Sequence, residues 1–340
     1  ERIICRGPDE TKIFKKEFNN LNIHLTFNRL SILELSQNGS QPIVDETNNY
    51  LMIFNGEIFN YIELKNYLKI YDNKFRSSNS DTEVLFYGLI NEGKDFVNKI
   101  IGQFAFVFFD LIKNEVIMAR DRTGQKPLFY CLVNDSLLTG SNLKSVSNLS
   151  GEKDIDITSF GEYLAQGVVT SPNTIYKNIF KLEPGSLATI NLNEENLKIK
   201  KELYWNISDF VSEKNNFDPD HFNSLISNSI ELRLRSDVPV ATFCSGGLDS
   251  SLIIKKISNN GYNIPTYSVI NQNPKYDESQ YINQVFRIPI SLSNAFMKLW
   301  EIFCSVPQLI PNRGKVSVFH LAEAPGQWIN CTKHFVKKRR

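Results

Sequence analysis

The sequence predicts an α+β layered domain followed by the beginning of a parallel α/β domain. In the first half, short apolar runs and turns bracket a segment with helical periodicity, a pattern typical of sheets covered by helices. In the second half, an apolar run, a glycine-containing loop and a helical segment follow one another directly, which is the order found in parallel α/β sheets. A length of 340 residues fits two domains of roughly 150 residues each.

Three apolar runs and one helix define the first domain. Residues 51–54 predict a strand that we expect to end at the turn dipeptide Asn55-Gly56. Residues 104–109 and 116–119 are separated by a polar turn, so they should form a hairpin. Helical spacing over residues 83–90 follows a helix start at Asp81.

The second domain should begin after a polar stretch. This stretch covers residues 191–201, past Pro184-Gly185, and marks the expected boundary. Beyond it we expect a helix over 222–235, a strand over 238–243 and a helix from 250 to about 258. The expected domains are therefore 1–190 and 203–287, followed by a separate segment over 288–340.

Composition excludes several classes of protein. A hydrophobic content of 41% and a net charge of +1 give no electrostatic reason for the whole chain to bind nucleic acid or a membrane surface. No apolar run approaches the ~20 residues that span a bilayer, and the first residues lack the apolar region of a signal peptide. Five cysteines without a Cys-x-x-Cys pair argue against a disulfide framework or structural zinc. We expect a cytoplasmic protein.

The most specific motif is the loop Ser245-Gly246-Gly247-Leu248-Asp249-Ser250-Ser251. Paired glycines allow backbone N–H groups to approach a ligand closely, and the following helix directs its positive end to the same place. The serine hydroxyls add donors, and Asp249 could hold Mg²⁺ against phosphate oxygens. A Walker loop is excluded because its Gly-Lys-Ser/Thr ending is missing. The alternative is a strand–turn–helix corner in which the serines serve as helix caps.

This loop resembles the PP-loop of ATP pyrophosphatases, which cleave ATP between the α and β phosphates. With the preceding residues 235–244, and with Tyr276-Asp277-Glu278-Ser279 further on, it resembles glutamine-hydrolysing asparagine synthetases in particular. The resemblance implies that the chain binds ATP and Mg²⁺, with Asp249 as the metal ligand. The implied ATP-binding residues are Cys244, Ser245, Gly246, Gly247, Asp249, Ser250 and Val269. Cys244 departs from the aliphatic residue usual in the family, a change that a backbone contact tolerates.

The first half resembles the class II glutamine amidotransferase domain of the same enzymes. Its matching motifs occur in the family's order: Arg6-Gly7-Pro8-Asp9, Arg29-Leu30-Ser31-Ile32, Asn55-Gly56-Glu57-Ile58-Phe59-Asn60, Ser80-Asp81-Thr82-Glu83, Ala119-Arg120-Asp121-Arg122 and Lys126-Pro127-Leu128-Phe129-Tyr130. The implied fold is the four-layer αββα sandwich of the N-terminal nucleophile hydrolases, followed by an incomplete α/β PP-loop domain.

The same resemblance implies a glutamine site. Arg29 offers a planar fork to the α-carboxylate of glutamine, beside Leu30, Ser31, Ile32 and Leu33. Glu57 and Asp81 suit the α-ammonium group, while the Asn55 side chain and the Gly56 N–H suit an oxyanion hole. Each of these residues alone would ordinarily be a surface charge or a turn residue. Their joint occurrence in the family's order is what predicts the site.

The family's nucleophile, an N-terminal cysteine whose α-amine serves as the base, is absent from this sequence. Cys5 directly precedes Arg6-Gly7-Pro8-Asp9, which is too late for the nucleophile, so we interpret it as a scaffold residue. We therefore expect the chain to be a fragment truncated at both ends that does not hydrolyse glutamine as given.

Beyond about Val285 the resemblance to asparagine synthetase stops. The order of elements over residues 292–328, including Lys298 and the loop at 323–328, resembles the start of FtsJ-type RNA 2′-O-ribose methyltransferases. That resemblance implies S-adenosylmethionine binding at the loop and a catalytic role for Lys298. The alternative is an unrelated or frame-shifted tail in which Ala-Pro-Gly is only a turn.

For the whole enzyme, the resemblance implies that ammonia from glutamine attacks β-aspartyl-AMP, formed from ATP and aspartate, to give asparagine. Two alternatives stay open: a relative that adenylates another carboxylate, and an inactive scaffold. A methyltransferase acting through the last segment is an alternative of another class. Expected partners are glutamine, aspartate and ATP, with no membrane, with nucleic acid only if that last segment is genuine, and with a homodimer left open.

Overall fold

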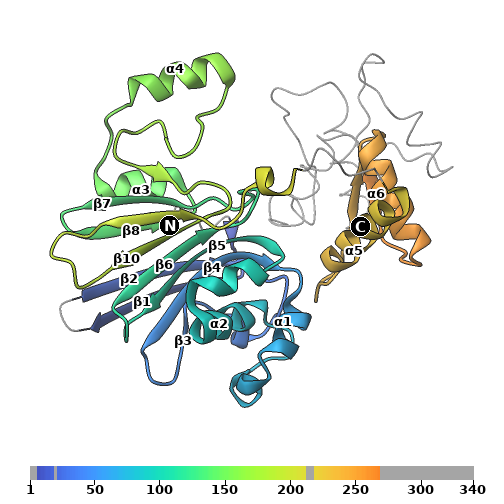
Figure 1. Ribbon diagram of the computed structural model, residues 1–340, viewed down its shortest axis with the longest axis horizontal. Helices are drawn as coiled ribbons and strands as arrows, with labels where there is room; N and C mark the ends of the chain where they lie inside the picture. The colour runs from blue at the N-terminus through green and yellow to red at the C-terminus, as the bar shows by residue number, and fades with distance from the viewer. Residues whose placement is uncertain (1–5, 19–20, 212–217, 269–340) are drawn as a thin grey trace, which may run out of the picture. The chain divides into compact units, whose positions relative to one another are not determined.

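The computed structural model describes residues 6–18, 21–211 and 218–268. They form two compact units (Figure 1). Among the described residues, the first unit runs to residue 211 and also includes Arg235–Val238, and the second comprises Asp218–Leu234 and residues 239–268. The predictions for Cys5, Val269, Lys298 and the remainder of 269–340 lie outside the described residues.

A six-stranded sheet forms the centre of the first unit, with the strand order β11-β10-β6-β5-β4-β3. Every neighbouring pair is antiparallel. The predicted hairpin is confirmed, because β5 pairs with β6 directly. The strands are β3 (Ile43–Val44), β4 (Tyr50–Ile58), β5 (Gly102–Asp110), β6 (Glu115–Arg120), β10 (Ser186–Asn191) and β11 (Ile199–Leu203).

The expected turn at Asn55-Gly56 is wrong, because β4 continues through both residues to Ile58. Asn55 is paired with Ala105 and Gly56 with Phe104 on β5, so pairing with a central strand overrides the local turn preference. Glycine is required here for space. A Cβ atom on Gly56 would lie 2.1 Å from the carbonyl oxygen of Gln103.

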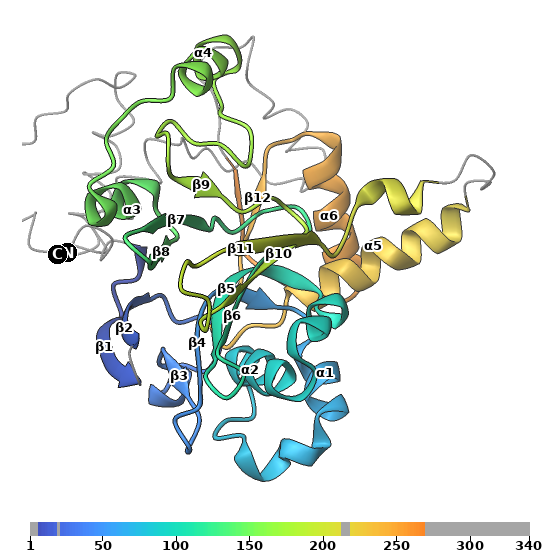
Figure 2. The ribbon, with the colours of Figure 1, turned by 60° about the vertical axis from the view of Figure 1, so that its left-hand side comes forward.

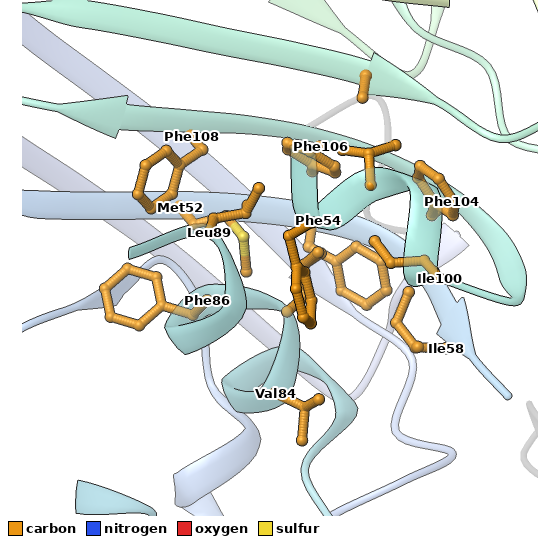
Figure 3. Close-up of a cluster of buried hydrophobic side chains, with 14 of the residues drawn as sticks. Met52, Phe54, Ile58, Val84, Phe86, Leu89, Ile100, Phe104, Phe106 and Phe108 are labelled. Atoms are coloured by element: carbon orange, nitrogen blue, oxygen red, sulfur yellow. The ribbon is translucent and has the colours of Figure 1, made fainter. Parts of the chain in front are cut away.

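Helices α1 (Tyr61–Tyr67) and α2 (Asp81–Glu92) cover one face of this sheet. Figure 3 shows Phe86 and Leu89 of α2 beside Met52 of β4 and the phenylalanines of β4 and β5. Phe86, Phe104 and Phe106 are almost completely buried. The predicted helix is confirmed, and it begins where the Ser80 hydroxyl accepts a hydrogen bond from the N–H of Glu83 at 3.1 Å.

A second sheet, β8-β7-β9, packs on the opposite face of the first. Val107 and Met118 of the large sheet meet Tyr130 of β7 in this inner core, and α3 lies against β7 and β8 (Figure 2). The order of layers is helix, sheet, sheet, helix, which confirms the αββα sandwich. The elements are β7 (Phe129–Val133), β8 (Ser136–Gly140), β9 (Phe180–Lys181) and α3 (Leu143–Ser150).

The remaining elements of this unit lie outside the two sheets described above. The hairpin β1–β2 packs its Ile23 against Leu51 of β4. The polar stretch expected as a linker contains β11, an edge strand whose side chains are mostly exposed. These elements are β1 (Glu10–Phe18), β2 (Leu21–Arg29), α4 (Ile157–Gln166) and the 3₁₀ helices Gln37–Gly39, Lys69–Lys74, Gly93–Lys99 and Ile207–Phe210.

The second unit has the predicted parallel α/β character. Its strands β12 (Thr242–Cys244) and β13 (Thr266–Ser268) are parallel and are connected through α6 (Leu248–Asn259). Helix α5 (Pro219–Arg233) packs on α6. The strand expected over 238–243 begins only at Thr242, because Arg235–Val238 belongs to the first unit. Among the described residues, no helix has the length and apolarity that crossing a membrane requires.

Candidate functional site

The last residues of β4 combine an unpaired donor with a close backbone approach. The side-chain amide nitrogen of Asn55 is buried and has no hydrogen-bond partner among the residues that the structure describes. An unpaired buried donor of this kind costs about 1–3 kcal/mol, a cost that a ligand oxygen would remove. Gly56 follows directly, where only a residue without Cβ fits against Gln103. This is the arrangement expected of an oxyanion hole.

Asp81, the first residue of α2, lies beside the end of β4. Its carboxylate accepts a hydrogen bond from the N–H of Ile58 at 2.9 Å, and its side chain is buried. Burial, together with the smaller effect of the neighbouring Glu57 charge, raises the pKa of Asp81 to about 7. The two carboxyl groups are therefore neighbours, and a bound ammonium group would stabilise both in their ionised form.

Arg29, at the end of β2, is buried and already engaged. Its guanidinium donates hydrogen bonds to the carbonyl oxygens of Ser36 at 2.8 Å and of Glu34, and it lies 3.8 Å from the Glu10 carboxylate. The fork thus fastens the loop that follows β2. The predicted role of Arg29 in binding the glutamine carboxylate stays a prediction.

The loop after β2 carries the predicted residues Leu30, Ser31, Ile32 and Leu33. The N–H of Ser31 donates to the Asp9 carboxylate at 2.7 Å, and Leu33 packs against the core under α2. Leu30 is 59% exposed and Ile32 is 38% exposed. The loop is therefore anchored at both ends and leaves two apolar side chains accessible.

Sequence analysis missed a carboxylate network beneath this loop. Glu34 has a positive φ of 49° and its carboxylate bonds the hydroxyl of Ser77. Ser77 in turn donates its N–H to Glu83 at 3.1 Å, and the Arg76 side chain donates to Glu83 at 2.9 Å. In the sequence, Glu83 stands out only as the last residue of the Ser80–Glu83 motif, and that motif does not indicate these contacts. Glu34 has no sequence signal, because its contacts come from distant segments.

The motif Ala119-Arg120-Asp121-Arg122 is structural. Arg120 donates to three carbonyl oxygens, those of Lys126, Leu182 and Gly124, at 2.6–2.7 Å. Asp121 accepts backbone N–H groups from the loop that follows and from Phe104. Together they fix the connection between the two sheets.

The glycine loop of the second unit leads into α6. Gly246 has a φ of 87°, a conformation that favours glycine. The hydroxyls of Ser245 and Ser250 lie 3.1 Å apart, and the Ser245 hydroxyl accepts the N–H of Gly247 at 3.3 Å. No side chain caps α6, which argues against the alternative that the serines are helix caps.

This loop fits a phosphate better than an independent metal site. Its backbone N–H groups and hydroxyls suit a chain of phosphate oxygens. Asp249, in the first turn of α6, is the predicted Mg²⁺ ligand. Within the described part of the chain, no group of three His, Cys, Asp or Glu residues could hold a metal ion. Any Mg²⁺ here would therefore take most of its ligands from phosphate and water. Cys244, at the end of β12, is buried.

Comparisons with known proteins agree with the resemblance. The sequence model of the glutamine amidotransferase domain family matches residues 1–205, and that of asparagine synthase matches residues 221–287. The chain therefore belongs to the glutamine amidotransferase family. More particularly, its two matches occur in the order of the glutamine-hydrolysing asparagine synthetases.

Named relatives support this assignment. Asparagine synthetase [glutamine-hydrolyzing] 1 of Bacillus subtilis is 34% identical over 269 residues, which cover 79% of this chain and 41% of the relative. A Methanocaldococcus jannaschii protein, provisionally named as an asparagine synthetase, is 34% identical over 82% of this chain and 57% of its own length. The chain thus spans about half the length of the curated relatives it matches.

Two further proteins are similar to this chain at lower identity. Amidase chry2 of Gibberella zeae is 29% identical over 75% of this chain and 37% of its own. A solved structure, the allosteric regulatory enzyme of purine biosynthesis, aligns with a TM-score of 0.38 at 19% identity, over 74% of this chain and 52% of the other. That score is too low to inform the site.

Proposed function

We propose that the chain contributes the glutamine site and the ATP loop to the glutamine-dependent, ATP-driven amidation of aspartate to asparagine. The observation that carries this proposal is the buried Asn55 amide nitrogen, which lacks a partner beside the glycine backbone of Gly56. A donor held in this way stabilises negative charge that develops on a ligand oxygen. The carboxamide oxygen of glutamine becomes such an atom when water or a nucleophile attacks its carbon.

In this proposal the glutamine is held by its charged end. Asp81 and Glu57 bind its α-ammonium group, and Arg29, together with the loop of residues 30–33, binds the α-carboxylate. Hydrolysis converts glutamine and water to glutamate and ammonia. No described residue is proposed as the nucleophile of this hydrolysis.

The second unit binds ATP through residues 244–250. The free N–H groups at the start of α6 and the hydroxyls of Ser245 and Ser250 hold the phosphates, and Asp249 holds Mg²⁺ against them. The aspartate carboxylate then displaces pyrophosphate from ATP to give β-aspartyl-AMP. Ammonia displaces AMP from this intermediate and leaves asparagine.

Ammonium-supported pyrophosphate release tests the acceptor. The protein is supplied with ATP, Mg²⁺ and ammonium chloride, and pyrophosphate is measured with aspartate, with glutamate or with neither. Release that requires aspartate is the expected result. Release that is equal with glutamate would point to another carboxylate, and ATP binding without any release would contradict amidation by this chain.

A further inference from the structure

A short segment from the synthetase half of the sequence belongs structurally to the glutaminase unit. Arg235–Val238 follows α5 and precedes the phosphate loop, yet it is part of the first unit. Two charged side chains of this segment, those of Arg235 and Asp237, make contacts with the first unit. We call it the clasp segment.

Arg235 fixes one end of the clasp segment. Its guanidinium forms two hydrogen bonds of 2.6 Å with the Glu63 carboxylate and donates to the carbonyl oxygen of Phe59 at 2.8 Å. This bidentate pairing lowers the pKa of Glu63. The Arg235 side chain is only 26% exposed, so the pair is partly shielded from water and geometrically specific.

Asp237 fixes the other end to two loops of the glutamine site. One carboxylate oxygen accepts the backbone N–H of Glu34 at 2.8 Å, and the other accepts the side-chain amide of Asn79 at 3.1 Å. Its own N–H donates to the carbonyl oxygen of Ile32 at 3.1 Å. Asp237 therefore joins the loop after β2 to the segment that leads into Asp81.

The position of Asp237 explains how Glu34 keeps its conformation. Glu34 has a positive φ of 49°, which is uncommon for a residue with a side chain. Its N–H is held by Asp237 and its carbonyl oxygen by Arg29. Both hydrogen bonds involve a charged partner, and such hydrogen bonds are roughly twice as strong as those between neutral groups. Loss of either should let the loop of residues 30–36 relax.

From these contacts we propose that Asp237 is a positioning residue for the glutamine site. It holds the loop of residues 30–36 in register with the Ser77–Asp81 segment, and it lies only eight residues before Ser245 of the phosphate loop. The inference rests on the proposed function in one respect, since it takes glutamine as the ligand of this loop.

The test compares glutamine affinity across a set of variants. Calorimetric titration with glutamine should show Asp237→Ala binding about tenfold more weakly, with an unfolding midpoint close to that of the parent chain. Asp237→Asn should recover most of the affinity, because its side-chain oxygen still accepts the Glu34 N–H once Asn79 turns its oxygen toward the new amide. The double variant Asp237→Asn with Asn79→Asp should recover it as well. Asp72→Ala, an exposed acidic residue of the same unit, is the control.

Hydrogen exchange separates failure of the inference from failure of the proposed function. Faster exchange at the Glu34 amide in Asp237→Ala, but not in Asp72→Ala, is expected whether or not glutamine binds. A parent chain that binds no glutamine would overturn the proposed function and, with it, the glutamine role of Asp237. Unchanged glutamine affinity in Asp237→Ala, or unchanged exchange at Glu34, would overturn the positioning role itself.

Discussion

The carboxylate of Asp81 accepts a hydrogen bond of 2.9 Å from the backbone N–H of Ile58. This contact joins the first residue of α2 to the last residue of β4. It brings Asp81 beside Glu57, although the two residues come from different elements. The group most affected is Asp81, because burial raises its pKa to about 7.

Asp81 should make glutamine binding depend on pH. An ammonium group binds the ionised carboxylate, so glutamine affinity should rise as the pH increases through about 7 and level off by pH 8. Asp81→Asn should bind glutamine weakly and without this rise. Calorimetric titrations at pH 6, 7 and 8 measure the effect, and an equal rise in the variant would refute the assignment.

Asp81 should also shape the stability of the fold. Its pKa in the folded chain is raised above the unfolded value of about 3.9, so only the folded state keeps the proton between these limits. The free energy of unfolding therefore loses a favourable contribution as the pH rises from about 4 to 7. Relative to the parent chain, Asp81→Asn should gain at most about 4 kcal/mol over this interval. Urea unfolding at several pH values measures the free energy of unfolding of the variant and of the parent chain. A difference between the two that became smaller from pH 4 to pH 7 would contradict the prediction.

Gly246 and Gly261 offer a matched pair for testing the phosphate loop. Their φ values are 87° and 83°, and they lie before and after α6. Alanine should strain the backbone at either position by about 1–2 kcal/mol. Only Gly246→Ala should weaken binding of ATP with Mg²⁺, by tenfold or more, because only Gly246 belongs to the predicted phosphate loop that precedes α6. Equal losses of ATP affinity in both variants would show an effect of stability alone.

Gly56 should tolerate no side chain. A Cβ atom would lie 2.1 Å from the Gln103 oxygen and 2.7 Å from the Phe104 Cα, both backbone atoms that cannot move aside. We expect Gly56→Ala to lower the free energy of unfolding by more than about 3 kcal/mol. Gly161→Ala, in the exposed helix α4 with open space around it, should instead raise it by about 1 kcal/mol. Urea unfolding midpoints of both variants test whether the two substitutions change stability in opposite directions.

The sequence predicts elements well where a local pattern determines them. The β5–β6 hairpin, the start of α2 and the strand–loop–helix order of β12 and α6 all follow from apolar periodicity and from cap or loop residues. Prediction fails at Asn55-Gly56, because a turn-forming dipeptide is taken into a strand by its neighbour β5.

Long-range contacts account for what the sequence does not predict in the site. The sequence does not reveal that the Arg29 guanidinium holds the carbonyl oxygens of Glu34 and Ser36, and the predicted contact of Arg29 with the glutamine carboxylate stays a prediction. Glu34 and Asp237 are separated by 203 positions in the chain, so no motif spacing reveals their contact. A family pattern is enough to name the residues of the proposed glutamine site. The residues that hold them in place can be identified only from the folded structure.

In the proposed glutamine site, the Asn55 amide nitrogen donates a hydrogen bond to the carboxamide oxygen of glutamine. Glutamine titration of Asn55→Ala and of the parent chain, with urea unfolding of both, tests it most directly. Because the nitrogen has no partner among the described residues, and an unpaired buried donor costs about 1–3 kcal/mol, the substitution should leave the free energy of unfolding unchanged or raise it, while glutamine affinity falls tenfold or more. Unchanged glutamine affinity, or a loss matched by a large loss of stability, would contradict the claim.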